Sequence, residues 1–124
     1  MLYSIETPED IATGLAGIEE TLAEWNFSKK TRVNVLTVCS ELMYNAVTHA
    51  KEGTIDVARY DGAVEIVAVD RGAGLPPVSD AFAEGWSSAS SLGIGLPGVL
   101  RICDELFIET SEAGTRIRSV VRTE

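Results

Sequence analysis

The chain has 124 residues, 45% of them hydrophobic and 23% charged, which is enough for a single domain, residues 1–124, with its own hydrophobic core. Its formal net charge of −9 argues against binding to nucleic acid or to an anionic membrane, because both need clustered Lys and Arg. No signal peptide is recognisable at the start and no apolar run approaches the ~20 residues needed to span a bilayer, so we expect a cytoplasmic protein.

The first fifty residues are expected to form a short strand and two helices. Residues 1–6 favour an edge strand. The Thr-Pro-Glu-Asp sequence at 7–10 is typical of a helix start, and this helix is expected to run to about Trp25. Ser28 can cap a second helix that reaches about Ala50.

The rest of the chain is expected to form two hairpins and a third helix. Asp61-Gly62 between two apolar runs is a strong hairpin signal. Residues 71–92 form a long loop rich in Gly, Pro, Ser and Ala, a kind of segment that is usually functional or mobile. The expected elements are strands 54–60 and 63–69, a helix at about 94–103, and strands 106–110 and 115–121, the last two joined by a turn at Glu112-Ala113-Gly114.

This order of elements predicts an α+β fold. The expected order is one strand, two helices, two strands, a loop, one helix and two strands, so three helices segregate from a mostly antiparallel sheet. We expect a two-layer α/β sandwich, with a mostly antiparallel sheet covered on one face by three helices.

Two cysteines, Cys39 and Cys103, lie inside apolar helical patterns. Neither has the Cys or His spacing of a metal site. We therefore expect two reduced core thiols and a reducing compartment.

The second helix is expected to carry a polar stripe with almost no charge. Its apolar face comprises Val35, Val38, Cys39, Leu42 and Ala46, and its opposite stripe comprises Asn34, Thr37, Glu41, Asn45 and Thr48. Glu41 and Asn45 are four residues apart, so they lie one above the other. A carboxylate and a carboxamide in this arrangement can ligate a hard cation, or can position a hydroxyl and accept its proton. The alternative is an ordinary solvated helix face.

Asp70 ends a buried strand and is followed by Gly72 and Gly74. A carboxylate at this point can accept a hydrogen bond from an exocyclic amine such as that of adenine, and the glycines allow the backbone to approach a flat ligand. A tight turn with a surface aspartate would produce the same sequence.

A second glycine-rich segment, Gly93-Ile94-Gly95-Leu96-Pro97-Gly98, opens the third helix. Small residues at a helix N-terminus expose backbone N–H groups that can bind phosphate. A flexible hinge is the alternative interpretation. Because the acidic chain would repel bare ATP, a nucleotide site here should recruit a divalent cation.

Together these segments resemble the GHKL ATP-binding superfamily. The segment Glu41-Leu-Met-Tyr-Asn45-Ala-Val-Thr-His49-Ala resembles its N box, and Asp70-Arg-Gly72-Ala-Gly74 and Gly93-Ile-Gly95 resemble its two glycine boxes. The short length and the Leu92–Val99 segment resemble the RsbT-type switch kinases. The His49 ending is more similar to the RsbW and SpoIIAB anti-sigma kinases.

The resemblance implies a Bergerat fold and a role for each matched residue. Glu41 would be the general base toward a substrate hydroxyl, Asn45 would ligate Mg²⁺, and Asp70 would bind the adenine amine. The other implied ATP contacts are Gly72, Gly74, Gly93, Gly95, Leu96 and Thr115. Residues 75–92 would be the ATP lid. For His49, a role at the helix C-terminus is the expectation from the residues alone.

The resemblance also implies a function. Such proteins phosphorylate Ser or Thr of STAS-domain antagonist proteins in stress and sigma-factor signalling by partner switching, with a PP2C-type phosphatase or a sigma factor as a further partner. The alternative is a non-catalytic module that sequesters such a partner, with ATP setting only its shape. An ATPase that attacks with water is a third, less favoured hypothesis. The sequence leaves open whether the chain is a monomer or a dimer.

Overall fold

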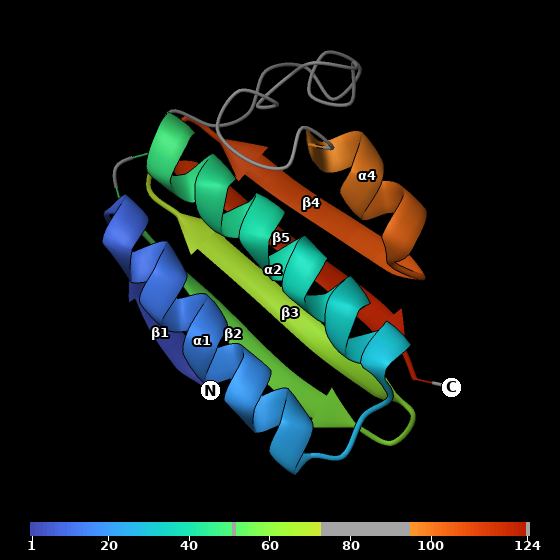
Figure 1. The fold of residues 1–124 in the computed structure, drawn as a ribbon. Coiled ribbons are helices and arrows are strands. Elements are labelled where there is room, and N and C mark those ends of the chain that lie inside the picture. Colours follow the sequence, from blue (N-terminus) through green and yellow to red (C-terminus); the bar gives the residue numbers. More distant parts are fainter. Residues whose placement is uncertain (51, 73–94, 124) are drawn as a thin grey trace.

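A computed structural model describes residues 1–50, 52–72 and 95–123. Eight elements follow one another within these residues (Figure 1): β1 (Leu2–Ile5), α1 (Pro8–Glu24), α2 (Lys29–His49), β2 (Gly53–Tyr60), β3 (Ala63–Asp70), α4 (Gly95–Ile102), β4 (Glu105–Ser111) and β5 (Gly114–Arg122).

The five strands form one sheet in the order β1-β2-β3-β5-β4, and every neighbouring pair is antiparallel. The described helices all lie against the same face of this sheet, with α2 running roughly along the strand direction over its centre (Figure 1). The predicted two-layer α+β sandwich is therefore confirmed.

Alternation along the strands explains which face the helices cover. On β5, Thr115, Ile117, Ser119 and Val121 are all buried, as their shared face in the sequence predicts. Apolar side chains of α1 and α2 complete this core, including Ile18, Leu22, Val35, Val38, Cys39 and Leu42.

Helix α1 begins where the sequence predicts. The Thr7 side chain accepts from the backbone N–H of Asp10, and the Asp10 carboxylate accepts from the N–H of Thr7. This reciprocal capping box satisfies backbone donors that the helix itself cannot pair.

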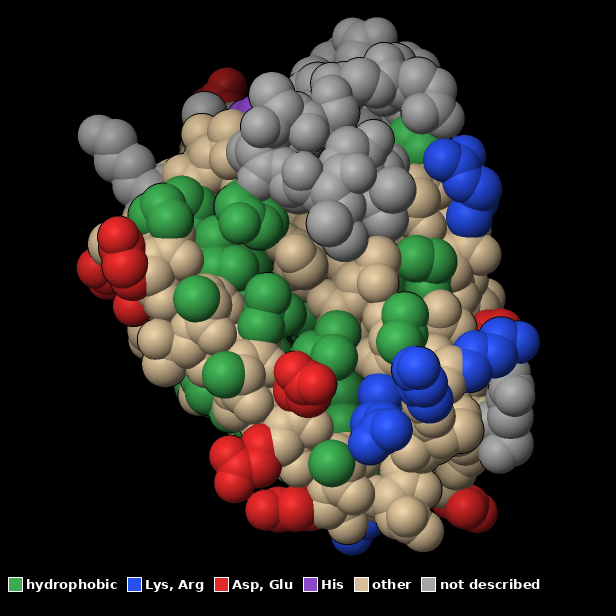
Figure 2. Space-filling model, in the orientation of Figure 1, with side chains coloured by type: hydrophobic (Ala, Val, Ile, Leu, Met, Phe, Trp, Pro, Cys, Tyr) green, Lys and Arg blue, Asp and Glu red, His purple; other side chains and the backbone are tan. Residues whose placement is uncertain are grey.

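Helix α2 has an unfavourable first turn. Ser28 caps it, but Lys29, Lys30 and Arg32 follow, with no acidic residue in the turn. Basic side chains gather over this end of the helical face (Figure 2). Positive charge at a helix N-terminus opposes the helix dipole, so packing rather than charge must hold this end in place.

Two expectations need correction. The last hairpin turns at Glu112 and Ala113, and Gly114 is already the first residue of β5, with φ +143. Cys39 is buried as expected, whereas Cys103 follows α4 and is only half-buried. Burial raises the pKa of both thiols.

None of the described helices is long and apolar enough to cross a bilayer.

Candidate functional site

Asp70 is the last residue of β3 and lies between the ends of two neighbouring strands. The register places Gly53 of β2 on one side of it and Thr115 of β5 on the other. The Asp70 carboxylate accepts a hydrogen bond of 3.0 Å from the backbone N–H of Gly72. The turn after β3 therefore fixes the orientation of this carboxylate.

Three glycines allow the backbone around Asp70 to pack closely. A Cβ on Gly72 would lie 2.7 Å from the Ala50 Cβ and 2.9 Å from the His49 carbonyl oxygen, both at the C-terminal end of α2. A Cβ on Gly53 would lie 2.9 Å from the Val69 carbonyl oxygen, and one on Gly114 would overlap the carbonyl oxygen of Asp70. A side chain at any of these positions would displace the strand end that carries the carboxylate.

Helix α2 lies across from Asp70 and carries Asn45, which lines a cavity shared with Asp70. Glu41 lies one helical turn before Asn45 and is not among the residues that line this cavity. Glu41 is 0% exposed and Asn45 is 5% exposed, so the stripe in which they lie faces a covered space at these positions and not open water. Thr48, further along the same stripe, is exposed.

The Asn45 carboxamide is buried without hydrogen bonds. Within the described residues, neither its Oδ1 nor its Nδ2 has a partner. A buried polar group without a partner costs roughly 1–3 kcal/mol, and proteins seldom retain one unless something else satisfies it. A ligand or an ordered water can satisfy these two atoms.

Asn45, Asp70 and Thr115 meet at one small cavity between α2 and the sheet. Its other lining residues are Leu42, Ala46, His49, Ala68, Val69 and Ile117, and its volume is about 10 Å³. This is about the space of one water molecule, so a planar base can enter only if these walls separate. Thr115 is held by a 2.8 Å contact between its hydroxyl and that of Thr110.

His49 also lines this cavity, in the last turn of α2. The sequence placed it at a helix terminus but not at the site. Partial burial lowers its pKa, and the nearby Asp70 carboxylate opposes that shift. The signal that could have located it is its spacing from Asn45, which is one helical turn.

The start of α4 contributes the remaining described residues of the predicted site. Gly95 has φ +57, a conformation that favours glycine. The Leu96 side chain is fully buried in the core, so only its backbone N–H is available to a phosphate. Gly74, Gly93 and the predicted lid at 75–92 lie outside the described residues.

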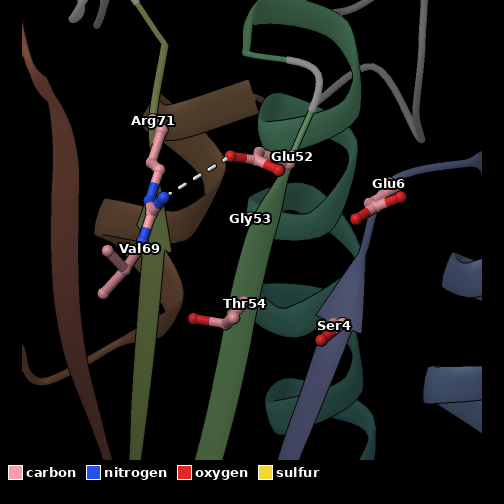
Figure 3. A pocket seen from close by; sticks show the side chains of 7 residues that line it. All are labelled: Ser4, Glu6, Glu52, Gly53, Thr54, Val69 and Arg71. Carbon is pink, nitrogen blue, oxygen red and sulfur yellow. Dashed lines mark ion pairs between the residues drawn. The ribbon is translucent and has the colours of Figure 1, made fainter.

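Two larger hollows lie near this cavity. A cleft of about 400 Å³ follows the ends of β3, β4 and β5 and shares Asp70 and Thr115 with the cavity. A second, of about 300 Å³, lies on the other face of the sheet and is lined by Ser4, Thr54 and Val69 (Figure 3). Neither contains Asn45, so the smaller cavity is the better candidate for the site.

The metal-binding capacity of the site rests on Asn45. Among the described residues, no three His, Cys, Asp or Glu side chains converge as metal ligands. A single carboxamide oxygen fits Mg²⁺, which keeps several waters and takes phosphate oxygens as ligands. The unpartnered Oδ1 of Asn45 is therefore consistent with a cation carried in with a nucleotide.

A helix-on-sheet domain with a carboxylate and a carboxamide at one cavity, and close-packed glycines beside that carboxylate, is compatible with nucleotide binding. Residues 6–121 match the model of the histidine kinase-like ATPase domain, and the chain belongs to this family. Membership implies ATP binding, and it confirms the resemblance that the sequence predicts.

The chain is also similar in sequence to a bacterial serine/threonine-protein kinase. The serine/threonine-protein kinase RsbT of Bacillus subtilis (strain 168) is 31% identical to the chain over 102 residues, which are 78% of this chain and 77% of RsbT. The chain is therefore homologous to a serine/threonine kinase across most of its length.

Solved structures share the fold. The structure of the RsbU and RsbW domains of Rv1364c from Mycobacterium tuberculosis superposes with a TM-score of 0.74 at 21% identity, covering 99% of this chain and 31% of that one. This chain thus spans about a third of that protein. The catalytic domain of histidine kinase ThkA has a TM-score of 0.57 at 17% identity, covering 98% and 95% of the two chains. The mycobacterial sensor histidine kinase MprB has a TM-score of 0.56 at 20% identity, covering 75% and 72%.

Proposed function

We propose that this domain is an ATP-dependent serine/threonine protein kinase of a partner-switching pathway, and that its substrate is a STAS-domain protein. The observation that carries the proposal is the pair Glu41 and Asn45, which are buried one turn apart on α2. The homology to RsbT supports the reaction type.

In this proposal the cavity holds the adenosine end of ATP. The Asp70 carboxylate accepts from the adenine amine, with Gly72 and Gly74 beneath the ring and Thr115 beside it. The backbone N–H groups at Gly93, Gly95 and Leu96 hold the phosphates. Asn45 would hold Mg²⁺, which neutralises phosphate charge when it is bound.

Glu41 is then the general base. The oxygen of a substrate Ser or Thr attacks the γ-phosphorus, and the bond to the oxygen that bridges the β- and γ-phosphates breaks. The substrate proton passes to the Glu41 carboxylate and ADP leaves. Because little covalent chemistry is left to the protein, most of the rate enhancement comes from positioning and charge.

The burial of Glu41 favours a second candidate. A carboxylate that is 0% exposed cannot meet a hydroxyl of another protein unless the surrounding structure opens. A non-catalytic module that binds ATP and sequesters a partner would need no such opening.

One experiment distinguishes the kinase from the non-catalytic binding module. The protein is incubated with γ-labelled ATP, Mg²⁺ and candidate STAS-domain proteins, and transfer to Ser or Thr is measured by mass spectrometry. Glu41→Gln preserves shape and should reduce transfer by about 10²–10⁴-fold while ATP affinity stays unchanged. The matched control Glu19→Gln makes the same change on exposed surface of α1 and should leave both unaltered.

Two outcomes oppose the kinase proposal. Full transfer by Glu41→Gln would remove Glu41 as the base. Intact γ-phosphate after prolonged incubation of the wild-type protein with a bound partner would favour the binding module.

A further inference from the structure

A groove opens between α1 and α2, on the side of these helices that faces away from the sheet. It has a volume of about 340 Å³, and its lining comprises Leu15, Glu19, Val33, Leu36, Thr37 and Ser40. The cavity that contains Asn45 and Asp70 shares none of these residues. The groove is therefore a separate feature from the candidate nucleotide site.

The groove presents mostly apolar surface. Val33 is 51% exposed, and Leu15 and Leu36 are only half-buried at the edge of the core. The Thr37 hydroxyl already donates to the Val33 carbonyl oxygen at 2.8 Å, so its proton is used within its own helix. Among the described residues that line the groove, Glu19 carries the only charge. Half-exposed aliphatic side chains around a hollow can receive the apolar side chains of a partner.

The groove leads along α2 toward a basic end. Its lining positions on α2 recur at spacings of three and four from Val33 to Ser40, so they form one stripe. One turn before Val33 this stripe reaches Lys29, and Arg32 lies one turn before Leu36. Basic side chains are seen together at this end of the helical face (Figure 2). The groove therefore ends in positive charge.

The cations at this end are not neutralised by the protein. Among the described residues, no carboxylate forms an ion pair with Lys29 or Arg32. The chain has 19 acidic residues for 10 basic ones, and three arginines of β5 each pair with an acid. Unpaired cations are therefore a local exception in this acidic chain. They also oppose the dipole of α2, and sequences tend to retain such a conflict at functional surfaces.

We propose that the groove is a docking site for an amphipathic helix of a partner protein, whose apolar side chains enter the groove and whose acidic end meets Lys29 and Arg32. Apolar side chains at i, i+3, i+4 and i+7 are the usual anchors of a helix in such a groove. Charge sets the orientation, because Lys29 and Arg32 attract carboxylates whereas Glu19 repels them. The proposal goes beyond the kinase function and does not depend on it.

A helix in the groove is not placed to accept phosphate. Glu41 projects from α2 about 100° around the helix axis from Ser40, and it is fully buried whereas the groove is open. A hydroxyl of the docked helix therefore does not face the proposed base. The groove supplies affinity and choice of partner, and the phosphate acceptor reaches the protein elsewhere.

Peptide binding to the whole chain tests the proposal. The probe is a fluorescein-labelled helical peptide with leucines at i, i+3, i+4 and i+7 and a run of glutamates at its N-terminal end, where they also favour its own helix. The control peptide has lysines in place of the glutamates. The acidic peptide should give saturable fluorescence anisotropy, and the lysine peptide should bind at least tenfold more weakly. In ¹⁵N-labelled protein, amide shifts should change at Leu15 and Val33–Ser40 and not in β4.

Two pairs of variants separate docking from folding. Lys29→Glu should weaken binding of the acidic peptide at least tenfold and strengthen binding of the lysine peptide. This change favours the dipole of α2, so unfolding does not account for the loss. Arg71→Glu makes the same charge change at a side chain that is 83% exposed and should leave binding unaltered. Val33→Glu should abolish binding, whereas Phe107→Glu, at a residue 48% exposed on β4, should not.

Several results would overturn the proposal. One is no binding of the acidic peptide at about 1 mM, and another is equal binding of both peptides. Binding that survives Lys29→Glu and Val33→Glu would place the peptide elsewhere. The same amide shifts on concentrating the protein alone, or with anionic lipid vesicles and not with the peptide, would assign the groove to a second copy or to a membrane. ATP binding and phosphotransfer are measured in parallel, because their loss would affect the proposed function and not the groove.

Discussion

Replacing Gly72 with alanine tests how closely the turn after β3 packs against α2. The added Cβ would be 2.7 Å from the Ala50 Cβ, whereas ordinary contacts begin near 3.4 Å. The turn must therefore move by about 0.7 Å, since its neighbours are backbone and a methyl group that cannot rotate away. Overpacking of this kind costs about 1–3 kcal/mol, which for a domain of this size lowers the Tm by about 4 °C per kcal/mol.

The same movement should weaken nucleotide binding. Gly72 donates the hydrogen bond that orients the Asp70 carboxylate, and misaligning it should reduce ATP affinity about tenfold. The assays are thermal unfolding and isothermal titration calorimetry with Mg²⁺ and ATP.

Gly62→Ala is the matched control. Gly62 has φ +75, and nothing lies within 4 Å of a Cβ there. Strain alone should cost about 1–2 kcal/mol, without any effect on ATP affinity, because the turn lies at the other end of β3. If Gly72→Ala lowers ATP affinity no more than Gly62→Ala does, the close packing around Asp70 does not organise the site.

Two further predictions concern helix termini. The Asp10 carboxylate accepts from the N–H groups of Glu6 and Thr7, which lowers its pKa below the ordinary 3.8; its stabilisation is therefore present above that pH and is lost as the pH falls through the lowered value. Asp10→Asn should reduce the free energy of unfolding at pH 6, and urea denaturation should show the difference from wild type shrinking below about pH 4. Lys29→Glu replaces a positive charge in the first turn of α2 with a negative one. It should raise the free energy of unfolding by about 0.3–1 kcal/mol at low salt. An unchanged or lower free energy of unfolding would mean that the helix dipole does not contribute to stability at this end.

Local rules predicted the elements well because most boundaries are set by nearby residues. The Thr7 cap, the Ser28 cap and the Asp61-Gly62 turn each act within a few residues, and the structure has all three. Alternation gives the buried positions of β5 from Thr115 to Val121, but Val120 between two of them is buried as well. Gly114 was placed in the turn and not at the start of β5, because its role depends on Asp70, which is distant in the sequence.

The candidate site was predictable only in part. The polar stripe on α2 identified Glu41 and Asn45, and their burial agrees with a covered space. The roles of Gly53 and His49 were missed, because each depends on which strand or helix end lies beside Asp70. The residue pattern within one helix or strand does not show which elements lie beside Asp70. The order of the strands in the sheet determines that.

Calorimetry on Asp70→Asn measures whether this carboxylate binds the adenine ring of ATP. The wild-type protein with Mg²⁺ should bind ATP and discriminate against GTP, whose ring presents a carbonyl where adenine presents an amine. Asp70→Asn keeps the shape but weakens a charge-assisted hydrogen bond, so ATP affinity should fall about 10–100-fold. Asp61→Asn, in the distant hairpin turn, should bind as wild type does. Unchanged ATP affinity in Asp70→Asn, or equal affinity of the wild type for ATP and GTP, would mean that Asp70 does not accept a hydrogen bond from the adenine amine.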